Sequence, residues 1–206
     1  MADHMGSFGS AIDGVNTPEI QQADNDYGVA LLVDKVAHTR YASDTLIFVL
    51  EDDAQDGPDH VDAHRSTGYV VGPYVKQHAV VSTRYATVNV LRTIEDVLGL
   101  EHLNVHDGGV APMTDVFDLR QRAWTFHAEP SDLLRTSTSL PLPPKRAGVA
   151  MLPLRPKHDA AWWAAQTLGF DFRKEDQNDP QKFNRVLWRG LMGDRPYPTH
   201  RARPKG

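Results

Sequence analysis

Apolar and polar residues follow one another at helical spacing in the first part of the chain. Between Asp24 and Tyr41 this spacing predicts an amphipathic helix. Its apolar positions are Val29, Leu32, Val33, Val36 and Ala37. Asp24 and its two neighbours suit the N-cap and first turn. Residues 1–22 are rich in turn formers and are expected to form a loop.

Two strands and a second helix are predicted next. The run TLIFVL at 45–50 is continuously apolar, which is typical of a parallel strand buried on both faces. Residues 67–71, followed by Gly72-Pro73, predict a second strand that ends in a turn. Tyr85 to Leu98 predicts a helix with Gly99 as its C-cap. Its expected core face consists of Val88, Leu91, Ile94, Val97 and Leu98. A helix followed closely by a strand indicates an α/β sheet covered by helices.

The second half of the chain is rich in loops. SLPLPPKR at 139–146 predicts an extended, proline-rich linker. Two short helices are expected, at 159–168 and at 180–191, the latter with Asp179 as N-cap and Pro180 at its first position. The paired Trp162 and Trp163 are expected to pack in a core or against a partner rather than to bind a ligand. We therefore divide the chain into residues 1–136, a linker at 137–157 and a helical extension with a basic tail at 158–206.

Composition narrows the classes of function. The 206 residues carry a formal net charge of −5, which argues against a nucleic-acid binder with a broad basic face. The chain has no cysteine, so a metal would be held by Asp, Glu or His side chains, by carbonyls or by water. No apolar run has the roughly 18 residues that a transmembrane segment needs. The first residues lack the basic and apolar regions of a signal peptide, and nothing in the sequence indicates a compartment.

The segment from Glu51 to His64 concentrates charge directly after the first predicted strand. Its 14 residues contain six carboxylates and two imidazoles. Ligands of open α/β sheets bind beyond the carboxyl ends of the strands, and crowded carboxylates repel one another unless a cation neutralises them. A solvated acidic surface loop is the alternative. We interpret the segment as a divalent metal site, suited to Zn, Mn or Fe, or to Ca or Mg if only oxygen ligands are used.

The same residues also resemble a known family. DTLIFVLEDDAQDGPDHVDAHRSTGYVVGPYVKQ is similar to the alkaline-phosphatase-like phosphoesterases, in the bacterial branch related to phospholipase C and acid phosphatase. The similarity extends upstream through ADHMGSFGSAIDGVNTPEIQQADNDYGVALLVDKVAHTRY, downstream through TVNVLRTIEDVLGL, and again at FNRVLWRGLMGDRPYP. It implies an α/β fold: a partial alkaline-phosphatase-like sheet flanked by helices, with a loop-rich, proline-rich helical C-terminal extension. It also implies metal-dependent hydrolysis of a phosphate monoester or diester.

The resemblance implies a set of metal ligands. In the family two divalent metals flank a Ser or Thr nucleophile, which implies Asp52 and Asp53 for one metal and His64 for the other. Asp3 and His4 match a further ligand pair; the family often spaces this pair four apart, and here the two are adjacent, so the ligand of the two stays open. Asp59, His60 and Asp62 either bind metal, orient the ligands or have a purely structural role, and the last two roles are favoured. Glu51 is a further candidate for orienting the ligands. Arg65 either contacts the phosphate or pairs with the acidic segment.

The chain departs from the family at the nucleophile. The family places that residue after an earlier strand, and the hydroxyls near the start of this chain, Ser7, Ser10 and Thr17, do not follow an apolar strand. We therefore expect the chain to be the metal-binding, C-terminal portion of a larger enzyme, with an N-terminal part as its partner. The alternatives are a non-catalytic metal-binding or interaction module and an inactive truncated product.

Other histidines carry weaker indications. His102 and His106, with Asp107, either add to a metal site or form a turn after the second helix, and the turn is the simpler interpretation. His38 and His78 stand alone in the sequence and are expected to be structural.

Overall fold

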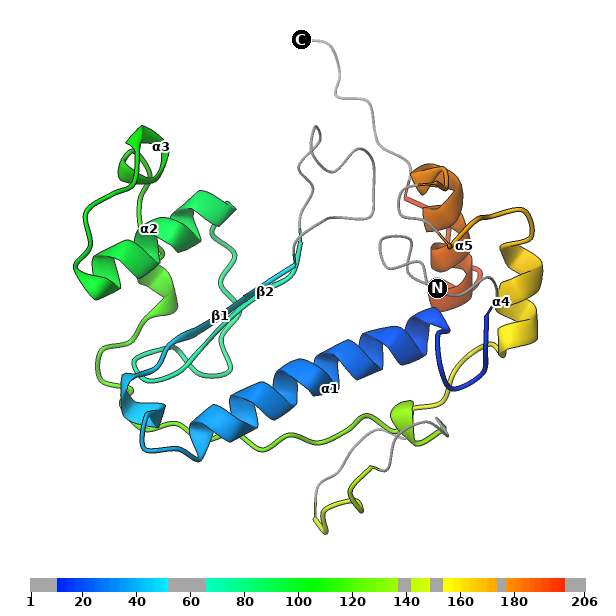
Figure 1. Ribbon diagram of the computed structural model, residues 1–206, viewed down its shortest axis with the longest axis horizontal. Helices are drawn as coiled ribbons and strands as arrows, with labels where there is room; N and C mark the ends of the chain where they lie inside the picture. The colour runs from blue at the N-terminus through cyan, green and yellow to red at the C-terminus, as the bar shows by residue number, and fades with distance from the viewer. Residues whose placement is uncertain (1–10, 52–65, 137–141, 149–153, 174–176, 199–206) are drawn as a thin grey trace. The chain divides into compact units, whose positions relative to one another are not determined.

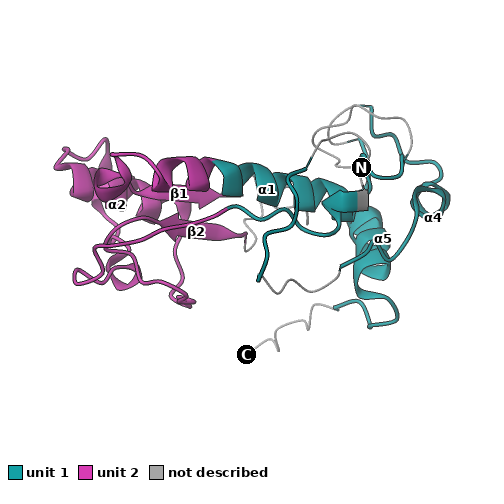
Figure 2. Ribbon diagram, turned by 90° about the horizontal axis from the view of Figure 1, so that it is seen from below, with its two compact units in different colours: residues 1–31, 53–65, 128–206 teal, residues 32–52, 66–127 magenta. Residues whose placement is uncertain are grey.

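The computed structural model describes residues 11–51, 66–136, 142–148, 154–173 and 177–198. Over these residues the fold is mostly helical, with five α-helices and a small two-stranded sheet (Figure 1). The chain forms two compact units (Figure 2). The described residues of unit 1 lie within 1–31 and 128–206, and those of unit 2 within 32–51 and 66–127. These two units do not test the division into residues 1–136, 137–157 and 158–206 that the sequence predicts, and that division stays a prediction.

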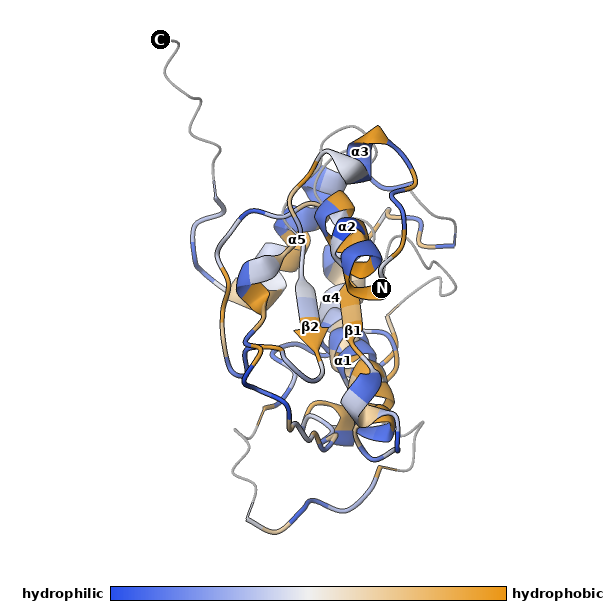
Figure 3. Ribbon diagram, turned by 90° about the vertical axis from the view of Figure 1, so that its left-hand side faces the viewer, coloured by the Kyte–Doolittle hydropathy of each residue, from blue (hydrophilic) through white to orange (hydrophobic). Residues whose placement is uncertain are grey.

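The sheet of unit 2 pairs β1 (Ile47–Leu50) with β2 (Gly68–Val71). The strands are antiparallel, and Phe48 lies opposite Val70. These two side chains pack against the core of unit 2, because residues opposite each other share a face of the sheet. The apolar character of β1 and of the end of β2 is visible in Figure 3.

The expectation of a parallel strand buried on both faces is wrong for β1. Its partner β2 runs antiparallel, Leu50 is 45% exposed, and Tyr69 on β2 is 58% exposed. Tyr69 lies on the face opposite to that of Phe48 and Val70 and is exposed there, as antiparallel sheets allow, while Leu50 is exposed at the end of β1. The run of five apolar residues at 46–50 specifies a strand but not the direction of the strand beside it.

The turn after β2 depends on Gly72. Its φ of 142° lies in a region that side-chain-bearing residues rarely adopt. A Cβ at this position would lie 2.6 Å from the carbonyl oxygen of Thr45, at the start of the neighbouring chain segment. The predicted Gly72-Pro73 turn is therefore present, and it brings the backbones too close for any other residue.

Helix α2 (Thr87–Leu98) confirms the second predicted helix and its cap. Gly99 adopts the left-handed conformation with φ 66°, and the N–H of Leu100 donates to the carbonyl of Glu95 at 2.9 Å, which closes a Schellman-type end. The expected core face is wrong at its C-terminal end, because Leu98 is 64% exposed and Val97 is exposed too. Val90 is buried instead, with Met113 and Val116.

Helix α1 (Pro18–Ala37) begins six residues before the predicted position. Proline at the first position and Glu19 in the first turn are a helix-start pattern that the acidic run at 24–26 obscured. The loop predicted for residues 1–22 is therefore wrong at 18–22. In unit 1 the buried positions Ile20 and Ala23 pack with Leu134.

The second core of unit 1 joins α4 (Ala160–Gln166) and α5 (Pro180–Met192). Helix α5 confirms its predicted cap, since the Asp179 side chain accepts from the N–H of Lys182. In α4, Asp159, which was expected as the first helical residue, is the N-cap, and its side chain accepts from the N–H of Trp162. Trp163 is completely buried against Phe172 and Phe183, which confirms the core role expected for it.

Short elements complete the described part of the chain. These are the helix α3 (Val105–Gly108) and the 3-10 turns η1 (Ala42–Asp44), η2 (Thr114–Val116) and η3 (Leu134–Thr136).

Candidate functional site

Glu51 is the one predicted site residue that the described part of the chain includes. It directly follows β1, and it continues the strand pairing by one residue. Its N–H donates to the carbonyl of Thr67 at 3.1 Å, and its carboxylate accepts from the N–H of Thr67, also at 3.1 Å. Glu51 thus holds together the two chain segments that flank residues 52–65.

The other predicted site residues lie outside the described residues. They are Asp3, His4, Asp52, Asp53, Asp59, His60, Asp62, His64 and Arg65. Their assignment as ligands or orienting groups stays a prediction.

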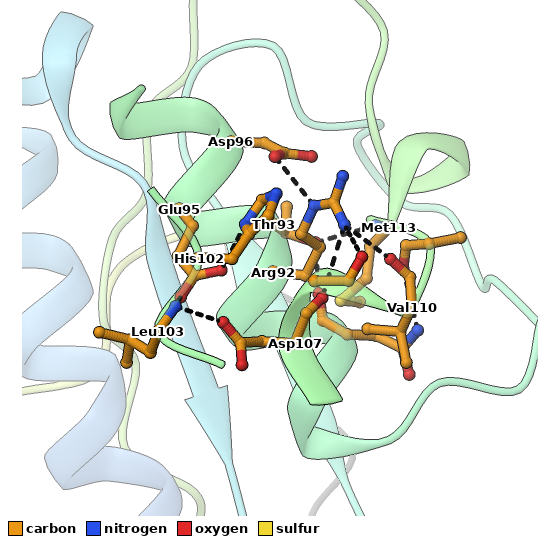
Figure 4. A network of polar contacts seen from close by, with 12 residues as sticks. Arg92, Thr93, Glu95, Asp96, His102, Leu103, Asp107, Val110 and Met113 are labelled. Atoms are coloured by element: carbon orange, nitrogen blue, oxygen red, sulfur yellow. Dashed lines mark hydrogen bonds and ion pairs between the residues drawn. The ribbon is translucent and has the colours of Figure 1, made fainter. Parts of the chain in front are cut away.

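A group of three potential ligands lies in unit 2, at the end of α2 and the segment after it. Glu95 is 3% exposed and Asp107 is fully buried, while His102 is at the surface. The Nδ1 atom of His102 is 3.1 Å from the Glu95 carboxylate. Potential ligand atoms of the three residues lie within 4.8 Å of one another (Figure 4).

Backbone hydrogen bonds determine the charge state of Asp107. Burial of the carboxyl group favours its neutral form, but hydrogen bonds from backbone N–H groups, including those of Asn104 and Leu103, outweigh burial and lower the pKa of Asp107. The N–H of Leu103 donates to it at 2.7 Å, and the N–H of Asn104 at 3.1 Å. Asp107 is therefore held as a carboxylate that fixes the turn before α3.

Further bonds join this turn to α2 (Figure 4). The guanidinium of Arg92 donates to the carbonyls of Gly108 at 2.9 Å and Val110 at 3.1 Å, and to the Asp96 carboxylate at 2.9 Å. The hydroxyl of Thr93 accepts from the N–H of Met113 at 2.8 Å. Side chains of α2 thus satisfy backbone groups of Gly108, Val110 and Met113 in the segment that follows the helix.

These contacts favour a structural role for the Glu95–His102–Asp107 group. The backbone N–H of Leu103 donates to both carboxylates, at 2.7 Å to Asp107 and 3.4 Å to Glu95, so a metal would have to compete with bonds already made. The turn interpretation of His102 and Asp107 fits this geometry, and His106 is exposed at the surface. The sequence analysis missed Glu95, because hydrophobic periodicity does not reveal a carboxylate on a buried face.

Comparison with family models, curated proteins and solved structures finds no significant match to this chain. Within the described ranges, no helix has both the length and the apolar character needed to cross a membrane.

Proposed function

We propose that this chain provides the metal-binding portion of a phosphoesterase that hydrolyses a phosphate monoester or diester. The observation that carries the proposal is the closure of residues 52–65 by Glu51 and Thr67. Two reciprocal bonds of 3.1 Å hold the ends of this segment at one end of the β1–β2 pair. Paired backbones lie about 5 Å apart, so the two chain ends between which residues 52–65 run are adjacent.

The excess of negative charge in residues 51–65 supports a bound cation there. Residues 51–65 contain six carboxylates and a single arginine. Like charges a few ångströms apart disfavour one another, and a bound cation relieves this repulsion. The two imidazoles at His60 and His64 add nitrogen ligands, which extend the choice of metal from Ca and Mg to Zn, Mn and Fe.

The resemblance supports the assignment of roles. Asp52 and Asp53 would hold one metal and His64 the other, with Asp3 or His4 adding a ligand. Two cations about 4 Å apart activate a nucleophile and stabilise the leaving oxygen in an in-line displacement. A wider alkaline-phosphatase-like sheet, with β1 among its strands, belongs to the same proposal. A nucleophile from an N-terminal part of the enzyme would complete the reaction.

Metal analysis and phosphatase turnover test the proposal. Purified full chain is measured by mass spectrometry for bound metals and by p-nitrophenyl phosphate hydrolysis, with and without EDTA. Asp52→Ala is compared with Glu101→Ala, a change of an exposed carboxylate in unit 2. We expect bound metal that Asp52→Ala reduces and Glu101→Ala preserves. When an N-terminal part supplies the nucleophile, we expect EDTA-sensitive turnover that Asp52→Ala abolishes and Glu101→Ala preserves.

Two results would overturn the proposal differently. If metal is bound through Asp52 but turnover stays absent even when a nucleophile is supplied, the chain is a metal-binding module and not part of a hydrolase. A chain that binds no metal would exclude both functions.

A further inference from the structure

The last turns of α1 place an acid and an imidazole on one face. Asp34 and His38 are four residues apart, which brings their side chains together on a helix surface. The Nδ1 atom of His38 lies 2.8 Å from the Asp34 carbonyl oxygen and 2.8 Å from its carboxylate. These contacts hold the Nδ1 side of the imidazole ring beside the Asp34 carboxylate, and a metal ion bound between the two would take the place of the proton at Nδ1.

A second imidazole comes from a distant part of the sequence in the same unit. The ring centroids of His127 and His38 are 4.6 Å apart, and their planes are inclined by 37°. Three residues before His127, the indole N–H of Trp124 donates to the carbonyl of Ala42 at 2.7 Å. This bond fastens the extended segment to the turn that follows α1, so the proximity of the two imidazoles is part of the packing of unit 2.

The three side chains have the composition and spacing of a transition-metal site. Ligand atoms of Asp34, His38 and His127 all lie within 4.8 Å of one another. Around a tetrahedral zinc ion at about 2.1 Å, neighbouring ligand atoms are about 3.4 Å apart. The two histidines are exposed, so side-chain rotations that move their ligand atoms by about 1 Å complete this geometry.

This group differs from the Glu95–His102–Asp107 group in the two properties that matter for binding. Among the described residues these are the two groups that bring three potential ligands together, and the one at α1 has two imidazoles. Its histidines also face solvent, whereas both carboxylates of the other group are buried. A metal ion from solution therefore reaches the α1 group without opening the fold.

We propose that Asp34, His38 and His127 form a site for a first-row transition-metal ion, with zinc as the representative, and that water fills its remaining positions. Two nitrogen ligands and one carboxylate favour zinc, cobalt, nickel or copper over calcium and magnesium. The site is separate in sequence from residues 52–65 and independent of the proposed phosphoesterase activity.

Zinc titration of loop-substituted protein tests this site. The full chain with Asp52→Ala, Asp53→Ala and His64→Ala is stripped with EDTA and titrated with Zn²⁺ by calorimetry. This triple variant is the parent for two further variants. One also carries His127→Ala, and the other carries His106→Ala as a matched control, since His106 is exposed and outside the group. We expect one zinc equivalent in the parent, at least tenfold weaker binding with His127→Ala, and unchanged binding with His106→Ala. Circular dichroism confirms that the exposed substitutions leave the fold intact.

Cobalt adds a readout of the ligands. Co²⁺ bound to the parent should show visible d–d absorption that His38→Ala or His127→Ala changes. Zinc binding that survives both histidine substitutions, or no zinc binding in the loop-substituted parent, would overturn this proposal. Neither result tests the phosphoesterase proposal, which depends on Asp52 in the otherwise unsubstituted chain.

Discussion

Replacement of Gly190 by alanine has two opposing effects on stability: it improves helix propensity, and it overpacks the core. The structure predicts that the overpacking is the larger effect. In a helix interior this change is expected to stabilise a protein by about 0.5–1 kcal/mol. A Cβ on Gly190 would lie 2.1 Å from the Cη2 atom of Trp163, where ordinary contacts begin at 3.4 Å. The indole ring would have to move by more than 1 Å.

The ring has little room for such a movement. Trp163 is completely buried, and Phe172 and Phe183 pack around it. Overpacking of a core costs about 1–3 kcal/mol, and a displacement of this size belongs at the upper end. After the propensity gain is subtracted, we expect Gly190→Ala to lower the free energy of unfolding by about 2 kcal/mol.

Urea denaturation followed by circular dichroism measures this change. Gly28→Ala is the matched control, because Gly28 lies within α1 and a Cβ added to it would have nothing within 4 Å. Its midpoint should rise while that of Gly190→Ala falls. Equal stabilisation by both substitutions would refute the packing of α5 against Trp163.

Two further predictions concern unit 2. Gly72→Ala should lower the free energy of unfolding by about 1–3 kcal/mol, measured by urea denaturation, because it combines a strained backbone with a close approach to the Thr45 carbonyl; an unchanged midpoint would contradict the strain. The pKa of Asp107 is lowered in the fold, so its hydrogen bonds stabilise the protein above about pH 4 and this contribution is lost as the pH falls through that pKa. Asp107→Asn should therefore reduce the loss of stability between pH 7 and pH 3, and an unaltered pH dependence would contradict the role assigned to the carboxylate.

Local elements were predictable where a short-range rule specifies them. Asp179 followed by Pro180 marks the start of α5, and Gly99 marks the end of α2, because caps depend on residues within one turn. The two strands were likewise evident from their apolar runs. The direction of β1 relative to β2 was not, since strand pairing depends on the path of the chain between them.

The buried polar groups of α2 could not be predicted from the sequence, for a different reason. Glu95 and Thr93 are both buried in α2, although hydrophobic periodicity predicts apolar residues at buried helix positions. Their partners, Leu103 and Met113, lie eight and twenty residues further on and contribute backbone groups, which leave no trace in residue type. His38 appeared to stand alone because His127 is 89 positions away in the sequence.

The bonds between Glu51 and Thr67 would link folding to the binding of the proposed metal ion. If an ion binds between residues 52 and 65 only when the β1–β2 end is paired, each opening of that end would cost the binding energy as well. At a ligand concentration 100 times its dissociation constant, such linkage is worth about 2.7 kcal/mol. The backbone amides of Glu51 and Thr67, each engaged in one of the closing bonds, are therefore natural hydrogen-exchange reporters of an ion bound further along the chain.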